Sequence, residues 1–327
     1  MALIKTIDEI KAVLKISNLD DNTSIPDVES AEETYFIPLL GNELYEQIQA
    51  AYDGNSLNPD QTKLLSKIQK PLAAIAFYDE LAIIHGKITE AGVRRTTTDS
   101  MPAAYRWEFE SVKDYLSNRY YQGIESMLKF LESNKDKFPV WVDGSGYKRR
   151  TRYLLKDPIE YSDNYMLQHP YQTYNSLLGV MGDVESIYIN PSIGKAFFDS
   201  LKALVTPSDD EKFVIEKLKK SIAHFCIKHA VEKLPVEISD AGFTVKNGTV
   251  DSKDAGKDPA NGDQLNLLMQ ACDRDGNTYL TAAIDYLNAT ASESAFTIFF
   301  ESDFYVAPSP PSQPKPDPNA GKKIFRF

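Results

Sequence analysis

The sequence predicts a mainly α-helical protein that repeats one helical-bundle unit in tandem, with short β-arms or hairpins and an extended Pro-rich C-terminal tail. Two matches predict the duplication. Residues 35–48 (YFIPLLGNELYEQI) resemble residues 188–201 (YINPSIGKAFFDSL) at an offset of 153 (188 − 35), and residues 88–93 (ITEAGV) resemble residues 238–243 (ISDAGF) at an offset of 150 (238 − 88). Apolar residues at three- and four-residue steps between these anchors predict helices.

Each copy is expected to hold its helices in the same order. The chain opens with an amphipathic helix in MALIKTIDEIKAVLKI, where recurring charges exclude a signal peptide. A long helix follows in each copy and starts near residues 58–60 (NPD) or 207–209 (PSD), and Pro71 predicts a kink in the first. Gly92 and Gly242 are predicted to end these helices at joints, because glycine accepts the left-handed conformation.

The segments after the joints, VRRTTTDS and FTVKNGTVDS, are expected to form loops or hairpin arms. A final helix then closes each copy, and the second of these is predicted over residues 277–290. The aromatic and β-branched residues of 138–142 (FPVWV) and 295–306 (AFTIFFESDFYV) predict strands or extended arms.

These patterns divide the chain into four parts. Residues 1–142 are predicted to be the first helical unit and residues 143–159 a basic linker. Residues 160–306 are predicted to be the second helical unit, and residues 307–327 a Pro-rich extended C-terminal arm that has no core of its own.

Composition narrows the function classes. The chain has 327 residues and a net charge of −11, which would repel a phosphate backbone over most of the surface. An acidic wall suits a channel through which DNA slides without sticking, although a charge that serves only solubility is a simpler interpretation of any one patch. The two cysteines are too few for a disulfide framework, and no segment approaches the length of a membrane span. These features predict a protein of a reducing cytoplasm.

The sequence offers weak support for catalysis or metal binding. His224 and His229 are five residues apart, so they point in different directions on a helix, and Cys226 between them lies on the apolar side. If Gly276 of residues 273–276 (DRDG) took position six of a calcium loop, positions one and twelve would be Ala271 and Ala282, so both required carboxylates are missing. The stretch therefore predicts a turn or helix cap. Neighbouring acids such as Glu32 and Glu33 are interpreted as solvated. We therefore predict that the protein is not an enzyme and holds no cofactor or metal.

The order of these segments resembles that of the head–tail connector proteins of tailed phages, the adaptor rings that sit below the portal. The resemblance is closest to a connector-like family, otherwise functionally uncharacterised, of phages and prophages of Bacteroidota. It covers about residues 1–305 and is carried by FPVWVDGSGY, YQTYNSLLGVM and YINPSIGKAFFDSL. These motifs are packing and turn residues, and the Pro-rich tail lies outside the match.

The resemblance implies a structural virion protein of the neck that is assembled in the cytoplasm of the host bacterium. It implies a homo-oligomeric ring of about twelve copies, or of about six because the unit is duplicated. The portal would lie on one side and tail or other neck proteins on the other, and DNA would pass through without sequence-specific binding and without membrane contact.

Two groups of residues are the candidates for contacts in such a ring. Partner contacts are expected from Ile324, Phe325, Arg326, Phe327, Arg94, Arg95, Lys246 and Asn247. A DNA-channel or subunit contact is expected from Lys148, Arg149, Arg150 and Arg152.

Two other functions stay open. The protein could be a cytoplasmic helical binding module that holds a peptide in a groove between its two halves, with the tail as a PxxP-type ligand. It could also be an enzyme whose site the sequence does not reveal.

Overall fold

The computed structural model describes residues 2–15, 25–89, 92–95, 106–167, 169–233, 236–239, 242–245 and 262–308. The first unit contains α1 (Ile7–Leu14), α2 (Val28–Ala31), η1 (Glu32–Phe36), α3 (Ile37–Leu40), α4 (Asn42–Asp53), α5 (Pro59–His85), β1 (Gly86–Thr89), β2 (Gly92–Arg95), α6 (Arg106–Glu132), η2 (Lys135–Lys137), α7 (Pro139–Asp143) and α8 (Ser145–Thr151). The second unit contains α9 (Pro158–Asn164), α10 (Pro170–Val184), η3 (Glu185–Ile189), α11 (Asn190–Ile193), α12 (Lys195–Ala203), α13 (Asp209–Lys233), β3 (Val236–Ser239), β4 (Gly242–Val245), α14 (Gly262–Thr290) and α15 (Thr297–Phe300).

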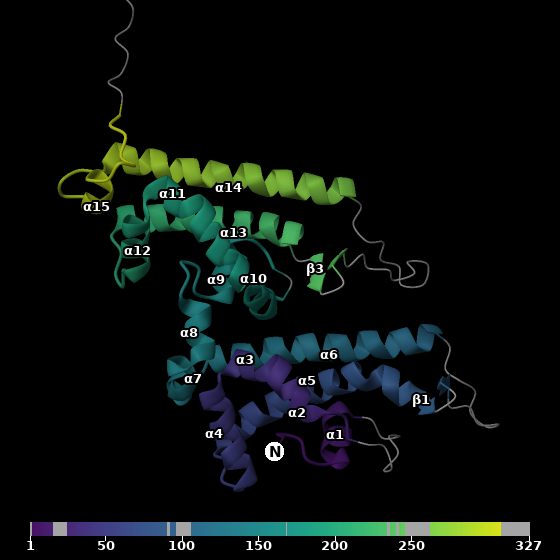
Figure 1. Ribbon diagram of the computed structural model, residues 1–327. Helices are drawn as coiled ribbons and strands as arrows, with labels where there is room; N and C mark the ends of the chain where they lie inside the picture. Colours follow the sequence, from purple (N-terminus) through teal and green to yellow (C-terminus); the bar gives the residue numbers. More distant parts are fainter. Residues whose placement is uncertain are drawn as a thin grey trace, which may run out of the picture.

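The two units lie side by side in the same orientation and form one continuous series of helical layers (Figure 1). In the first unit, α1 and α2 pack on α5, which packs on α6. The second unit repeats this order, because α9 and α10 pack on α13, which packs on α14. The contact of α6 with α10 joins the two series, and both hairpins lie at the same end of the molecule. The mainly helical, duplicated architecture is therefore confirmed.

Each long helix starts where the sequence predicts, and both starts use the same device. Asn58 N–H donates to Gln61 Oε1 at 3.0 Å, and Gln61 N–H donates to Asn58 Oδ1 at 2.8 Å. Ser208 and Glu211 exchange the corresponding bonds at 2.7 and 3.3 Å. These reciprocal bonds satisfy backbone N–H groups that a helix start leaves without intrahelical partners.

A π-helical turn and a left-handed glycine recur at equal positions in the two copies. η1 leads through α3 to Gly41 at φ 81°, and η3 leads through α11 to Gly194 at φ 83°. A side chain at φ values of this sign is strained, so glycine is needed where the chain turns into α4 and α12. A Cβ atom at Gly194 would also lie 2.9 Å from the Phe304 ring.

Each unit has its own apolar core. The first core runs from Leu3 to Trp141 and also takes in Tyr171, and the second runs from Tyr153 to Phe299. Much of the predicted linker 143–159 is therefore structured, because it forms α8 and then enters the second core at Tyr153. Of the predicted arm 307–327, only residues 307 and 308 lie within the described residues.

The predicted helix-end joints are wrong. α5 ends at His85 and α13 at Lys233, whereas Gly92 and Gly242 open the second strands of two hairpins. Gly92 pairs with Thr89, and Gly242 pairs with Ser239, in antiparallel register. The short runs of β-branched residues around them favour strands, and the hairpin ladder replaces the bonds that further helix would make.

Three other predictions from local sequence are also corrected. Residues 138–142 and 295–306 are not strands or extended arms, since they contain the short helices α7 and α15. The aromatic residues that suggested strands, such as Trp141 and Phe299, instead fill the two cores. Residues 273–276 do not form a turn but lie inside α14, where a Cβ atom at Gly276 would approach Phe225 to 2.8 Å.

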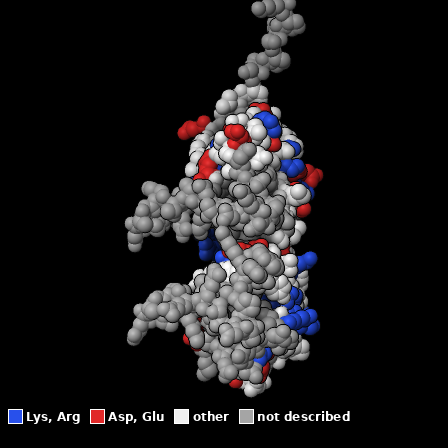
Figure 2. Space-filling view, turned by 90° about the vertical axis from the view of Figure 1, so that its right-hand side faces the viewer, with Lys and Arg blue, Asp and Glu red and all other residues white. Residues whose placement is uncertain are grey.

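Basic and acidic side chains are both present on the described parts of the two units at the hairpin end (Figure 2). None of the helices, as far as the described residues reach, combines the length and apolar character that crossing a membrane requires.

Candidate functional site: the contact between the two units

A carboxylate of the first unit covers the start of a helix of the second. Glu125 lies on α6, and its Oε2 accepts the backbone N–H groups of Tyr171 at 3.0 Å and Gln172 at 3.3 Å. α10 starts at Pro170 after His169, whose side chain makes no cap bond. The free N–H groups and positive dipole end of α10 are therefore stabilised from across the contact.

Burial raises the pKa of the Glu125 carboxyl, and the two backbone hydrogen bonds oppose part of that rise. Tyr171, which begins the same turn, is buried against the first core. The contact thus combines one buried aromatic ring with one half-buried carboxylate.

Arg150 is a second link between the units. Its side chain is 2% exposed, and Nη1 lies 3.0 Å from Glu132 Oε1. The guanidinium lies 5.6 Å from the ring centre of Trp141 in the first core and 6.0 Å from that of Tyr174 in the second. The Tyr174 hydroxyl is 2.6 Å from the Arg150 carbonyl oxygen and 2.7 Å from that of Leu155.

The prediction that Arg150 faces a DNA channel or another subunit is therefore wrong, because its charge is used inside the chain. Its neighbours Lys148, Arg149 and Arg152 are exposed, so their predicted contacts stay predictions. Arg152 lies over the Tyr153 ring, 4.8 Å from its centre.

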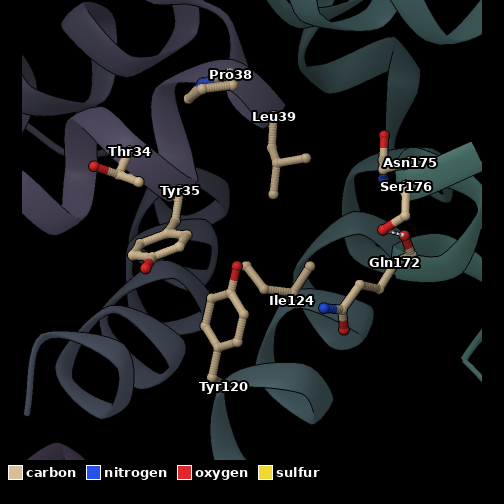
Figure 3. Close-up of a pocket in the computed structure, with 9 residues that line it drawn as sticks. All are labelled: Thr34, Tyr35, Pro38, Leu39, Tyr120, Ile124, Gln172, Asn175 and Ser176. Atoms are coloured by element: carbon tan, nitrogen blue, oxygen red, sulfur yellow. Dashed lines mark hydrogen bonds between the residues drawn. The ribbon is translucent and has the colours of Figure 1, made fainter. Parts of the chain in front are cut away.

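A pocket of about 200 Å³ lies between the units, beside the contact of Glu125 with the start of α10 (Figure 3). The first unit lines it with Thr34, Tyr35, Pro38, Leu39, Tyr120 and Ile124, and the second with Gln172, Asn175 and Ser176. The Tyr35 and Tyr120 rings meet edge to face at 5.7 Å. Burial raises the pKa of both phenols, so they offer neutral hydroxyls and no phenolate nucleophile. Hydroxyl and amide groups around an apolar floor suit a neutral polar group such as a peptide bond.

A buried carboxylate recurs in each unit, and the sequence interpretation missed it. Glu32 is 1% exposed, so its assignment as solvated is wrong. Its Oε1 accepts Leu3 N–H at 2.7 Å, and its Oε2 accepts the Tyr45 hydroxyl at 2.7 Å. In the second unit, Glu185 accepts Leu154 N–H at 2.8 Å.

The Oε2 atoms of these two buried carboxylates have different partners in the two copies. The position of Tyr45 is held by Phe198 in the second copy (198 − 153 = 45), which has no hydroxyl. There Lys202 Nζ lies 3.2 Å from Glu185 Oε2 instead. Burial raises the pKa of both Glu32 and Glu185, and each acid fixes the start of its unit. The recurrence of Glu at the 153-residue offset is the sequence signal that could have revealed this role.

The remaining predicted contact residues divide into two groups. The backbones of Arg94 and Arg95 lie in β2, at the hairpin end. Lys246, Asn247, Ile324, Phe325, Arg326 and Phe327 lie outside the described residues.

The histidine and cysteine cluster is part of the second core. Cys226 is fully buried, and His229 Nε2 lies 3.0 Å from the Tyr188 hydroxyl. In the portion that the structure describes, no three metal-ligating side chains lie within reach of one ion.

Comparison with known proteins gives one family match. The model described as "Family of unknown function (DUF6712)" matches the chain twice, at residues 36–151 and 189–308. Each match covers most of one unit and begins at the last residue of its π-helical turn. No curated protein and no solved structure matches the chain.

Proposed function

We propose that this chain, which belongs to the family of unknown function DUF6712 and carries its pattern once in each unit, is a structural ring component of a tailed-phage neck. It would assemble around the DNA channel between the portal and the tail. The observation that carries this proposal is the side-by-side repetition of one helical unit in a single orientation (Figure 1).

A contact between two similar units in the same orientation joins unlike faces, and repeating such a contact produces either a closed ring or a filament. The long helix pairs α5–α6 and α13–α14 would form the wall of the ring. Both hairpins lie at one end of the molecule, where they would extend towards neighbours by strand addition. The net charge of −11 would repel the phosphates of the DNA, so that DNA would slide through the channel without sticking to its wall.

The identity of the proposed partners comes from the sequence resemblance to connector proteins. The portal and tail or other neck proteins are the proposed neighbours, and the virion neck is the proposed location. Exposed Lys148, Arg149 and Arg152 lie near the junction of the units, where a channel or subunit contact would use them. The C-terminal residues Ile324 to Phe327 are proposed to hold a neighbour.

The test is to image the purified protein by negative stain, weigh its assemblies by native mass spectrometry, and search purified particles for the chain. We expect rings and a constant copy number per particle. A protein that is strictly monomeric and absent from particles would contradict the proposal.

A second function is favoured by one observation, the pocket between the units. A helical binding module would use the pocket beside Tyr35, Tyr120 and Gln172 to hold a peptide. A monomer that binds a defined peptide, and loses that binding when Tyr120 is replaced by alanine, would favour this function over the ring.

A further inference from the structure

The contact between the two units uses different faces of the same fold. The first unit contributes the outer side of α6 together with η1 and α3, and the second contributes α10. The second unit has its own version of the first of these faces, made by α14 with η3 and α11. In Figure 1 that version lies on the side of the second unit that is turned away from the first.

The correspondence of α6 and α14 can be set residue by residue from burial. The buried residues Leu116, Ile124, Met127 and Leu131 of α6 match the buried residues Cys272, Leu280, Ala283 and Leu287 of α14 at an offset of 156 (272 − 116). Glu125, which covers the start of α10, therefore corresponds to Thr281 of α14. Thr281 is exposed.

The outer side of α14 has groups suited to a contact of the same kind. Threonine is a helix-capping residue, so the Thr281 hydroxyl can accept a backbone N–H as Glu125 does. Leu267 lies four turns earlier on the same side of the helix, and it is 66% exposed. On η3, Ile187 is 54% exposed at the position of Thr34, which lines the pocket in the first unit.

We propose that this outer face, defined by Leu267, Thr281, Ile187 and Pro191, binds a second copy of this chain. The second copy would present the side of its first unit on which α2 lies, since Val28–Ala31 corresponds to residues 181–184, the last turn of α10 (181 − 28 = 153). The contact between chains would then repeat the contact within the chain, and the helical layers would continue from one molecule to the next. This inference rests on the proposed function, because it names the contact by which the ring would form.

A ring built by this contact would have a distinctive appearance. The two units of each chain would alternate around a single tier, so the ring would show twice as many equal lobes as it has chains. In a ring with two tiers, each unit would instead contact the same unit of the neighbouring chain. The number of lobes in one tier would then equal the number of chains.

The experiment compares three single variants of the full chain. Leu267→Arg and Thr281→Arg place a charge on the proposed face, whereas Val205→Arg places the same charge on a loop residue that is 95% exposed between α12 and α13. Circular dichroism checks that all three fold. Sedimentation over a concentration series measures the dissociation constant of self-association. Native mass spectrometry gives the number of chains in each ring, and negative-stain images give the number of lobes.

We expect self-association to weaken by about tenfold or more in Leu267→Arg and Thr281→Arg, and to change by less than about twofold in Val205→Arg. We also expect lobes at twice the chain number. Rings that form equally well in both face variants, or that show one lobe per chain, would overturn this inference and leave the proposed ring function standing. A wild-type chain that does not self-associate overturns the inference, and its absence from particles would overturn the ring function as well.

Discussion

Replacing Glu125 with alanine removes the carboxylate that covers the first turn of α10 from the neighbouring unit. The loss of a capping side chain costs about 1 kcal/mol, within a usual range of about 0.5–2 kcal/mol. Here the acceptor is charged and takes two N–H groups, at 3.0 and 3.3 Å, which places the cost at about 1–2 kcal/mol. Glu125→Gln keeps an oxygen acceptor and loses only the charge, so it should cost about 0.3–1 kcal/mol.

Hydrogen exchange of the backbone amides in the first turn of α10 measures this effect locally. A loss of about 1 kcal/mol corresponds to an exchange rate about fivefold faster at Tyr171 and Gln172 in Glu125→Ala. The amides of α13 should keep their wild-type rates. Glu110→Ala is the matched control, since Glu110 is an exposed acid on the same helix about four turns earlier.

Unchanged exchange at Tyr171 and Gln172 in Glu125→Ala would refute the reasoning that this carboxylate caps α10. Equal acceleration in Glu110→Ala would refute it too, because the effect would then come from the general helix change and not from the contact between units.

Three other predictions concern a buried acid, two glycines and the Arg150–Glu132 pair. Burial raises the pKa of Glu32 above its unfolded value, so the ionisation of this carboxyl works against folding. The free energy of unfolding should therefore fall as pH rises through the raised pKa. Glu32→Gln should flatten this dependence in urea melts from about pH 4 to 7. Gly194→Ala should lower the free energy of unfolding by about 1–3 kcal/mol, because the backbone at this position has a φ of 83°. Gly179→Ala should raise it by about 0.5–1 kcal/mol, because Gly179 lies inside α10 with open space where the Cβ atom would be. Thermal melts that rank the two variants alike would contradict this. Arg150→Met should cost about 2 kcal/mol in the same melts, since it removes one of the two cations beside the nearly buried Glu132 and leaves only Lys135, whose Nζ lies 2.6 Å from Glu132 Oε2. Adding Glu132→Gln should restore part of the loss, and a double variant no more stable than the single one would count against the pair.

Local errors in the sequence interpretation have one physical cause. The DRDG stretch at residues 273–276 favours a turn by composition, yet it lies within α14 because Gly276 lets that helix approach Phe225 closely. The motif at Phe138 to Val142 has the composition of a strand, yet its Trp141 is more stabilising as a residue of α7 that points into the first core. Packing energy in the core exceeded the small differences in local propensity at these places.

The candidate site was less predictable than the fold. Arg150 lies in a basic run whose composition suggests an exposed surface, and only its position between Trp141 and Tyr174 shows that its charge is internal. Glu125 looks like any acid on an amphipathic helix. Its role depends on Tyr171, which is 46 residues later in the chain, so no local pattern records it.

The sequence by itself determined the duplication, the helical class and the starts of both long helices. These properties depend on periodicity and on side chains that bond to the backbone within three or four residues, so short segments carry them. The tertiary structure alone decided which acids are buried, how Glu125 joins α6 to α10, and which face of α14 stays exposed. Those outcomes depend on contacts between distant segments, whose energies exist only when the layers are packed together.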